Sequence, residues 1–172
     1  TLLGQNVNSY GRDLMIDNKR SPYFTQLLYK IHEIDGIERI RFTSPHPKDF
    51  KEETLIAVSE LPKIANQIHI PLQSGSDKIL SSMHRGYNQK KYLSKIDMIK
   101  NIIPDVSLSS DVIVGFPGED DQDFKETIDL IKKVNFINSY SFIFSPRPGT
   151  VAENLKIIDK EISMERLEIV QK

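Results

Sequence analysis

Short apolar runs alternate along the chain with longer segments in which apolar residues recur every three or four positions. The runs predict buried strands and the longer segments predict amphipathic helices. The repeat of about 30 residues is typical of parallel βα units in an α/β protein. The predicted strands lie near 2–3, 40–43, 68–72, 108–114 and 140–144, and the predicted helices near 21–34, 50–61, 79–83, 88–103, 119–134 and 163–172.

The stretch at residues 110–119 predicts a strand that runs straight into a turn. Its apolar residues 112–114 are consecutive, which suits a strand covered on both faces. Gly115 and Gly118 let the backbone turn sharply, and the acids at 119–121 open the next helix at the positive end of its dipole. Strand, glycine turn and helix form a ligand site in many α/β proteins, but the same pattern also serves as a plain structural turn.

Local signals mark several helix ends. Ser21 with Pro22 predicts the start of the first helix, and Gly36 predicts its end. Asn88 is predicted to cap the helix that follows it, and Ser163 is predicted to cap the final helix.

Polar, glycine-rich or proline-rich segments follow every predicted strand, at 5–6, 44–46, 73–74, 115–117 and 145–147. Parallel strands bring their carboxyl ends to one edge, where barrel and open-sheet enzymes bind ligands. These segments therefore predict a shared ligand rim. Periodicity alone leaves a closed barrel and an open sheet as alternatives.

Composition narrows the chemistry. The net charge of −1 excludes a global basic field, so any RNA contact must come from a local patch. The absence of cysteine excludes a disulfide, a thiolate metal site and a cysteine nucleophile on these residues. No apolar run is long enough to span a membrane and the start is not leader-like, which favours the cytoplasm.

Neutral amides and hydroxyls dominate the predicted rim. Gln5, Asn6, Gln73 and Ser74 suit a ribose, an amino-acid backbone or a base edge, although each could equally cap a turn. Arg147 lies between two prolines and could contact a phosphate or carboxylate, or form an exposed salt bridge.

The four histidines do not predict a metal site. His69 lies in an apolar strand and is interpreted as a core residue, His46 as a solvated loop residue, and His32 and His84 as surface residues. No catalytic triad and no spaced carboxylate pair is present in the sequence, so the residues alone indicate a polar rim without a visible catalytic group.

Several motifs, taken in order, resemble the radical S-adenosylmethionine methylthiotransferases. The first segment resembles the strand that follows the cluster loop of that family, and the SFIFSPRPGT segment resembles its tRNA-modifying branch. The segments that carry the resemblance are 1–11, 39–47, 70–77, 83–87, 111–119 and 140–150.

The resemblance implies part of an incomplete TIM-like radical SAM barrel. It also implies methylthiolation of an isopentenyladenosine next to the anticodon of tRNA. The implied cofactors are S-adenosylmethionine and 4Fe-4S clusters, and the implied partners are tRNA and a sulfur donor. Carried over by motif, Gly4, Gln5 and Asn6 lie nearest the methionyl group of S-adenosylmethionine, and Gln73 and Ser74 lie nearest its ribose. Val114, Gly115 and Phe116 lie nearest its adenine, and Arg147 faces the tRNA.

The sequence departs from that family because it has no cysteine to bind a cluster. We therefore expect residues 1–155 to be a partial barrel without its first strand and cluster loop. Residues 156–172 are expected to be a helix leading toward a missing RNA-binding module. On this interpretation the full-length enzyme is a monomer, its ligand cysteines lie outside this chain, and this chain alone is inactive.

Two alternatives remain open at this point. A related enzyme could modify a ribosomal protein or another tRNA adenosine. Alternatively, the chain could be an inactive split-gene fragment that only binds a ligand or partner.

Overall fold

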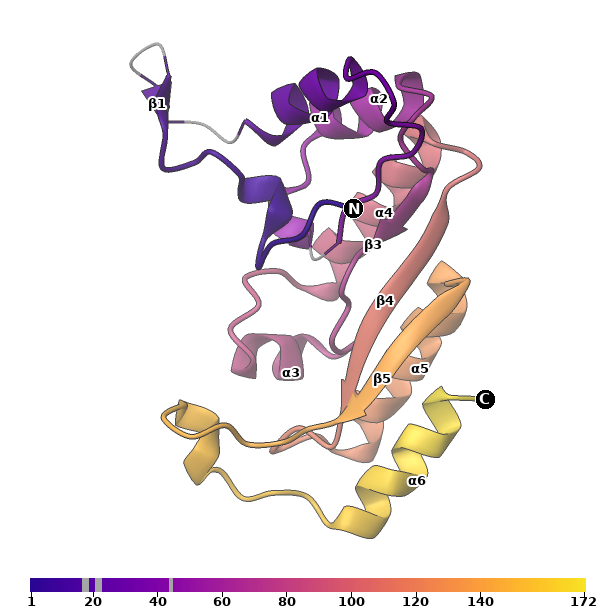
Figure 1. The fold of residues 1–172 in the computed structure, drawn as a ribbon. Coiled ribbons are helices and arrows are strands. Elements are labelled where there is room, and N and C mark those ends of the chain that lie inside the picture. Colours follow the sequence, from indigo (N-terminus) through magenta and orange to yellow (C-terminus); the bar gives the residue numbers. More distant parts are fainter. Residues whose placement is uncertain (17–18, 21–22, 44) are drawn as a thin grey trace. The chain divides into compact units, whose positions relative to one another are not determined.

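The structure is a computed structural model that describes residues 1–16, 19–20, 23–43 and 45–172 (Figure 1). These residues form two compact units. The first comprises Thr1–Pro71 and Leu93–Ser109, and the second comprises Leu72–Tyr92 and Ser110–Lys172. Strand β4 (Ser107–Val114) and helix α4 (Gln89–Ile102) each contribute residues to both units.

The first unit begins with short elements and continues with two helices. Its elements, besides parts of α4 and β4, are η1 (Val7–Ser9), β1 (Met15–Ile16), β2 (Lys19–Arg20), α1 (Phe24–His32), η2 (Pro47–Asp49), α2 (Glu52–Glu60) and β3 (Gln67–His69). Strands β1 and β2 form an antiparallel pair in a segment for which the sequence predicts no strand. The predicted helix start at Ser21 and Pro22 lies outside the described residues, as does Ser44 of the predicted rim.

Parallel pairing confirms the predicted fold class. Strand β3 pairs with β4 in parallel, with Ile68 opposite Leu108. The first two predicted strands are reduced to isolated parallel bridges, Leu2 with Phe42 and Ile40 with Ile64. Their few backbone hydrogen bonds keep the parallel order without forming a continuous ladder.

The core of the first unit is aromatic and aliphatic. Phe24 meets Phe42 edge-on with ring centroids 5.3 Å apart, and Phe50 packs on the other side of Phe42. Phe24 and Leu28 lie on the buried face of α1, which packs against α2, as the helical spacing predicts. Ile34, predicted to continue that face, is half exposed because α1 ends at His32.

The second unit contains α3 (Asp77–Ser82), α5 (Asp121–Val134), β5 (Asn138–Ile143), η3 (Val151–Asn154) and α6 (Lys160–Val170). Val112 and Val114 of β4 are fully buried, as their apolar run predicts. The strands of the described sheet are ordered β3–β4–β5, and this sheet is open rather than a closed barrel. None of the described helices has both the length and the apolar character needed to cross a membrane.

Helix α5 confirms its predicted start but not its predicted inward face. Asp120 caps it and forms a reciprocal capping box with Asp123. The helical spacing predicts an apolar side formed by Phe124, Ile128, Ile131 and Val134; Val134 is buried as expected, but the other three are only half-buried. The buried side is rotated by one residue, because it includes Asp123 and Thr127, whose side chains hydrogen-bond the segment before α3.

The prediction that Ser163 caps the last helix is wrong. Helix α6 begins three residues earlier, and Asp159 caps it by accepting a hydrogen bond from the Glu161 backbone at 2.8 Å. Ser163 is 2% exposed, and its hydroxyl donates to the Asp159 carbonyl. A serine of this kind looks like a cap in sequence, but here burial and the preceding aspartate decide its role. Asn88, in contrast, does accept a hydrogen bond from the backbone of Lys91 at the start of α4, as predicted.

Candidate functional site

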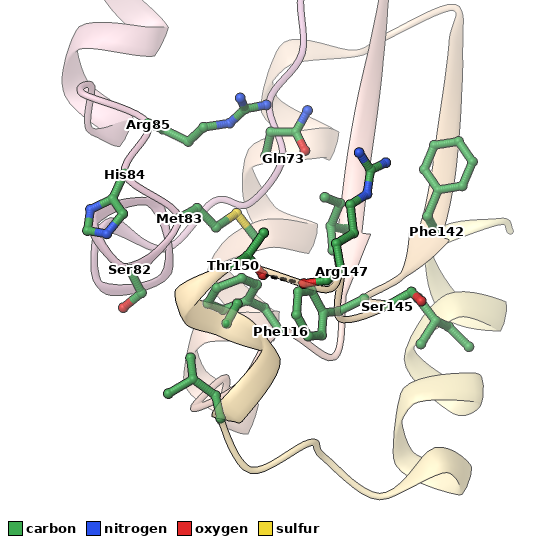
Figure 2. Close-up of a pocket in the computed structure, with 15 residues that line it drawn as sticks. Gln73, Ser82, Met83, His84, Arg85, Phe116, Phe142, Ser145, Arg147 and Thr150 are labelled. Atoms are coloured by element: carbon green, nitrogen blue, oxygen red, sulfur yellow. Dashed lines mark hydrogen bonds between the residues drawn. The ribbon is translucent and has the colours of Figure 1, made fainter.

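A cavity of about 710 Å³ opens in the second unit (Figure 2). Its walls come from the end of the segment before α3, the loop after α3, the turn after β4, and the end of β5 with the loop that follows. These are the predicted rim segments of this unit, together with the loop after α3. The volume is in the range of small-molecule and cofactor sites.

Gln73 is the most unusual residue of the wall. Its backbone donates to the Asp111 carbonyl and accepts from the Ile113 N–H, each at 2.8 Å, which extends the pairing with β4. Its φ of 68° lies in the left-handed region, which costs a non-glycine residue free energy. The residue is 7% exposed, and its side-chain amide makes no hydrogen bond to any residue that the structure describes.

Gln73 as a whole is buried, but its amide nitrogen and oxygen are not enclosed and open onto the cavity. An amide that faces a cavity without a protein partner can hydrogen-bond a ligand there. Figure 2 shows the amide of Gln73 directed into the cavity. The contact of Gln73 with a ligand stays a prediction, and the position of its amide is compatible with it.

Ser74, predicted beside Gln73, is placed differently. It is 1% exposed, and its hydroxyl lies 3.3 Å from the Thr127 hydroxyl and accepts from the Ser76 backbone. It does not line the cavity. The hydroxyl therefore ties the rim segment to α5, and its predicted contact with a cofactor stays untested.

The turn after β4 carries the other three predicted residues of this unit. The carbonyl of Val114 accepts from the Phe144 N–H at 2.8 Å, which joins the ends of β4 and β5. Gly115 has a φ of 71°, and a Cβ there would lie 2.5 Å from the Ser163 hydroxyl. Phe116 lines the cavity and packs edge-on against Phe144 with centroids 4.9 Å apart. Only glycine fits the second position, because both the backbone angle and the contact with α6 exclude a side chain.

A buried ion pair that the sequence did not reveal supports this turn. Arg166 of α6 donates to the Glu119 carboxylate at 2.8 Å and to Asp121 at 2.7 Å, and its guanidinium lies over the Phe124 ring. Glu119 and Arg166 are 7% and 5% exposed. Burial raises the pKa of Glu119, and hydrogen bonds from the Gly115 and Phe116 backbone with the charge of Arg166 offset part of that rise.

No local signal in α6 could have identified this arginine, because an arginine on a short helix normally faces solvent. The partner only becomes visible when the helix packs against the turn. The pair fixes α6 to the same turn that presents Phe116 to the cavity.

Gly4, Gln5 and Asn6 belong to the first unit, where Gly4 and Gln5 are exposed. The Asn6 amide donates to Asp49 at 2.8 Å, while its own carbonyl oxygen is buried without a partner among the described atoms. Burial alone would raise the pKa of Asp49, but hydrogen bonds from Asn6, Ser9 and Arg12 lower it overall. One polar atom of Asn6 therefore remains available to a ligand.

The histidines match their interpretation only in part: His69 is half-buried rather than in the core, and His32, interpreted as a surface residue, is half-buried with its Nε2 enclosed. The His69 ring lies 3.1 Å from the Ser109 hydroxyl, and the His46 ring accepts from the Lys48 backbone. His84 is exposed and lines the cavity, which the sequence did not indicate. Arg147 is exposed and also lines the cavity, at the position predicted to face a large substrate.

The described residues fit S-adenosylmethionine better than they fit an iron–sulfur cluster. An unpartnered amide and an aromatic wall suit a nucleoside with an amino-acid tail. A 4Fe-4S cluster needs cysteine thiolates, and the sequence contains none. Among the described residues, no group of three His, Asp or Glu side chains could hold a metal ion either.

Comparison with known proteins places the chain in a family. The profile of the Radical SAM superfamily matches residues 3–131. The tRNA-2-methylthio-N(6)-dimethylallyladenosine synthase of Thermoanaerobacter pseudethanolicus is 50% identical over 98% of this chain and 35% of its own length. The synthase of the same name from Legionella pneumophila strain Corby is 52% identical over 99% of this chain and 38% of its own. The chain thus spans little more than a third of these relatives.

A solved structure agrees on the fold. Coproporphyrinogen III oxidase from Escherichia coli, described as a radical SAM enzyme, matches 85% of this chain and 35% of its own with a TM-score of 0.64. At 14% identity that likeness concerns the fold alone. With a family match over residues 3–131 and the same fold, the chain belongs to the radical SAM superfamily.

Proposed function

We propose that this chain is the S-adenosylmethionine-binding part of a tRNA methylthiotransferase that modifies isopentenyladenosine next to the anticodon. The observation that carries the proposal is about 50% identity, over nearly the whole chain, to synthases named for that modified nucleoside. The superfamily match supports the use of S-adenosylmethionine and a 4Fe-4S cluster. Because the relatives are about three times longer, the activity belongs to a protein that supplies further parts.

S-adenosylmethionine, when bound and reductively cleaved, would supply the radical that removes hydrogen from an unreactive carbon. The part of this chain is to bind and orient. Gln73 would donate its amide to the ribose, and Phe116 would pack beside the adenine. Gly115 would form the tight turn that places Phe116 there. The buried Val114 would fix the position of that strand end. Ser74 would hold the rim segment against α5 at the edge of this site.

For the first unit, taken by itself, we propose that Gly4, Gln5 and Asn6 bind the methionyl part of S-adenosylmethionine, as the sequence resemblance implies. The unpartnered carbonyl of Asn6 suits the ammonium group of the methionyl part, and the exposed Gly4 and Gln5 offer free backbone groups next to it. We further propose that the cluster cysteines are supplied from outside these residues, that a sulfur donor and tRNA are the partners, and that the enzyme works as a cytoplasmic monomer.

A chimera tests this function. This chain would replace the matching segment of the Thermoanaerobacter synthase, and the chimera would be expressed in a strain lacking its own synthase. We expect mass spectrometry of tRNA nucleosides to show the methylthio product. Absence of the product, with a folded chimera that retains its clusters, contradicts the proposal; modification of a ribosomal protein instead favours the alternative substrate.

The role of Gln73 has its own test in that chimera. Gln73→Asn keeps an amide and tolerates the left-handed backbone, but it is too short to reach the same ligand atom. We expect it to raise the KM for S-adenosylmethionine by up to about tenfold, as loss of one hydrogen bond to a ligand does. The matched control is Gln26→Asn, on the exposed side of α1, which should leave KM unchanged.

A further inference from the structure

The charged residues that line the cavity of the second unit are all basic. Arg85 and Arg147 line it together with His84, and none of its lining residues is an aspartate or glutamate. Figure 2 shows both arginine side chains extending into the cavity region from opposite loops. Neither guanidinium makes an ion pair or hydrogen bond with any part of the chain that the structure describes. Two uncompensated guanidinium groups at one cavity indicate an anionic ligand.

Both arginines are presented by fixed backbone turns. The Arg85 N–H donates to the Leu80 carbonyl at 3.0 Å, and the preceding His84 takes a left-handed φ of 55°. The Arg147 carbonyl accepts from both the backbone and the hydroxyl of Thr150, the latter at 2.8 Å. The one carboxylate in that loop, Glu153, is engaged by the Gly149 N–H at 2.7 Å. The fold therefore fixes the backbone positions from which both side chains reach the cavity.

The rest of the wall combines aromatic rings with neutral polar side chains. Phe116, Phe142 and Phe144 contribute aromatic rings, and Phe142 is 54% exposed. Basic groups interleaved with exposed aromatic rings are the usual platform for single-stranded nucleic acid, where phosphates meet arginines and bases stack on rings.

S-adenosylmethionine does not account for both cations. It carries one carboxylate and a positive sulfonium, so at most one arginine finds a partner on it. Two phosphodiester groups of a strand satisfy both arginines, and the strand also brings a base for the exposed ring.

We propose that Arg85 and Arg147 each bind a phosphodiester group of one RNA strand, and that a base of this strand stacks on Phe142. This inference rests on the proposed function for the identity of the RNA, and it adds Arg85 and Phe142 to the binding surface. The contact is independent of sequence, because arginines on phosphates fix position while base edges carry specificity.

The test measures binding of a fluorescein-labelled single-stranded RNA as a function of salt. The full 172-residue chain and the chimera would each be titrated by fluorescence anisotropy after circular dichroism has confirmed folding. Arg85→Gln and Arg147→Gln should each reduce the slope of log K against log salt by about 0.7, the value for one phosphate contact on a single strand. Arg85→Lys retains a charge and should keep the slope.

Two further variants separate charge from stacking. Phe142→Ala should weaken binding about tenfold without changing the slope, because a base loses its ring but no counterion release is lost. Lys132→Gln, an exposed cation on α5, removes the same charge away from the cavity and should leave slope and affinity unchanged.

The inference is overturned if the slope of log K against log salt is the same for wild type, Arg85→Gln and Arg147→Gln. A loss of S-adenosylmethionine binding in calorimetry, with the RNA slope intact, also overturns it and assigns the arginines to the carboxylate of that cofactor. Failure of the proposed function is distinguishable: the chimera would then make no methylthio product while arginine-dependent RNA binding persists. If the chain alone does not fold, the same slopes measured in the chimera decide.

Discussion

The second unit has two regions of polar and charged side chains, one behind the turn after β4 and one in the cavity. They differ in whether these side chains already have hydrogen-bond or ion-pair partners within the protein. Behind the turn, Glu119 and Asp123 are buried and satisfied by Arg166, Ser76 and Lys78. In the cavity, the side chains of Gln73, Arg85 and Arg147 have no such partners among the described residues.

The difference separates scaffold from site. A buried polar group that is fully bonded holds elements together, and its loss lowers stability. A buried or converging polar group without a partner costs stability in the free protein and is retained where a ligand satisfies it. Removing groups from the first region should therefore unfold the protein, whereas removing groups from the second should abolish binding.

The largest effect is expected from Arg166→Met. It leaves the Glu119 carboxylate buried without its cation, which should lower the free energy of unfolding by about 3–5 kcal/mol in urea denaturation. Because burial already raises the pKa of Glu119 and Arg166 opposes that rise, the deficit should shrink at lower pH as the carboxyl takes up a proton.

The double variant Glu119→Gln with Arg166→Met should recover much of this loss, since no charge stays buried. Lys160→Met, an exposed cation on the same helix, should change stability by less than about 0.5 kcal/mol. If Arg166→Met and Lys160→Met lowered the free energy of unfolding by similar amounts, the distinction between the two regions would be wrong.

A smaller, graded effect is expected from acid. Hydrogen bonds from Lys78 and the Asp123 backbone lower the pKa of Asp120 to about 2. Burial raises the pKa of Asp123, but the Asp120 backbone and Lys78 lower it overall. Both carboxylates bind protons less readily when folded, so their stabilisation is present above the ordinary value of 3.8 and is lost as pH falls toward about 2.

Unfolding free energies measured between about pH 5 and about pH 2 check this sign. The wild type should lose stability steeply, and Lys78→Met should lose less because its carboxylates titrate closer to their ordinary values. Parallel curves for the two proteins would show that Lys78 does not couple to this cluster.

The smallest effect on stability is expected from Gln73→Gly. Glycine adopts the φ of 68° without strain but adds chain entropy to the unfolded state, so the free energy of unfolding should change by less than about 1 kcal/mol. Binding of S-adenosylmethionine to the same variant should nevertheless be lost in calorimetry. A destabilisation as large as that of Arg166→Met would make Gln73 part of the scaffold.

The sequence predicted the order of elements well where the apolar signal was strong. The run at 112–114 and the helix after Asn88 appear where expected, because burial there depends on local spacing. The strands near residues 2 and 40 shrank to bridges, because pairing depends on partners far along the chain. The prediction for Ser163 failed because this residue packs against Gly115, which lies far from it in the sequence.

The candidate site divides in the same way. Gln73 and Phe116 could be named from their place after strands, as could Arg147, and the structure puts all three at one cavity. Ser74 shares that sequence position, yet its hydroxyl points to Thr127. Arg85 was passed over because it follows a helix rather than a strand.

By itself the sequence determined that parallel βα units carry polar rim segments after their strands and that no thiolate is present, since periodicity and residue type are local properties. Only the tertiary structure decided which polar groups are already bonded and which remain available. Whether a polar group is bonded depends on side chains that come together from distant positions in the sequence. Arg166, for example, binds Glu119 and does not line the cavity.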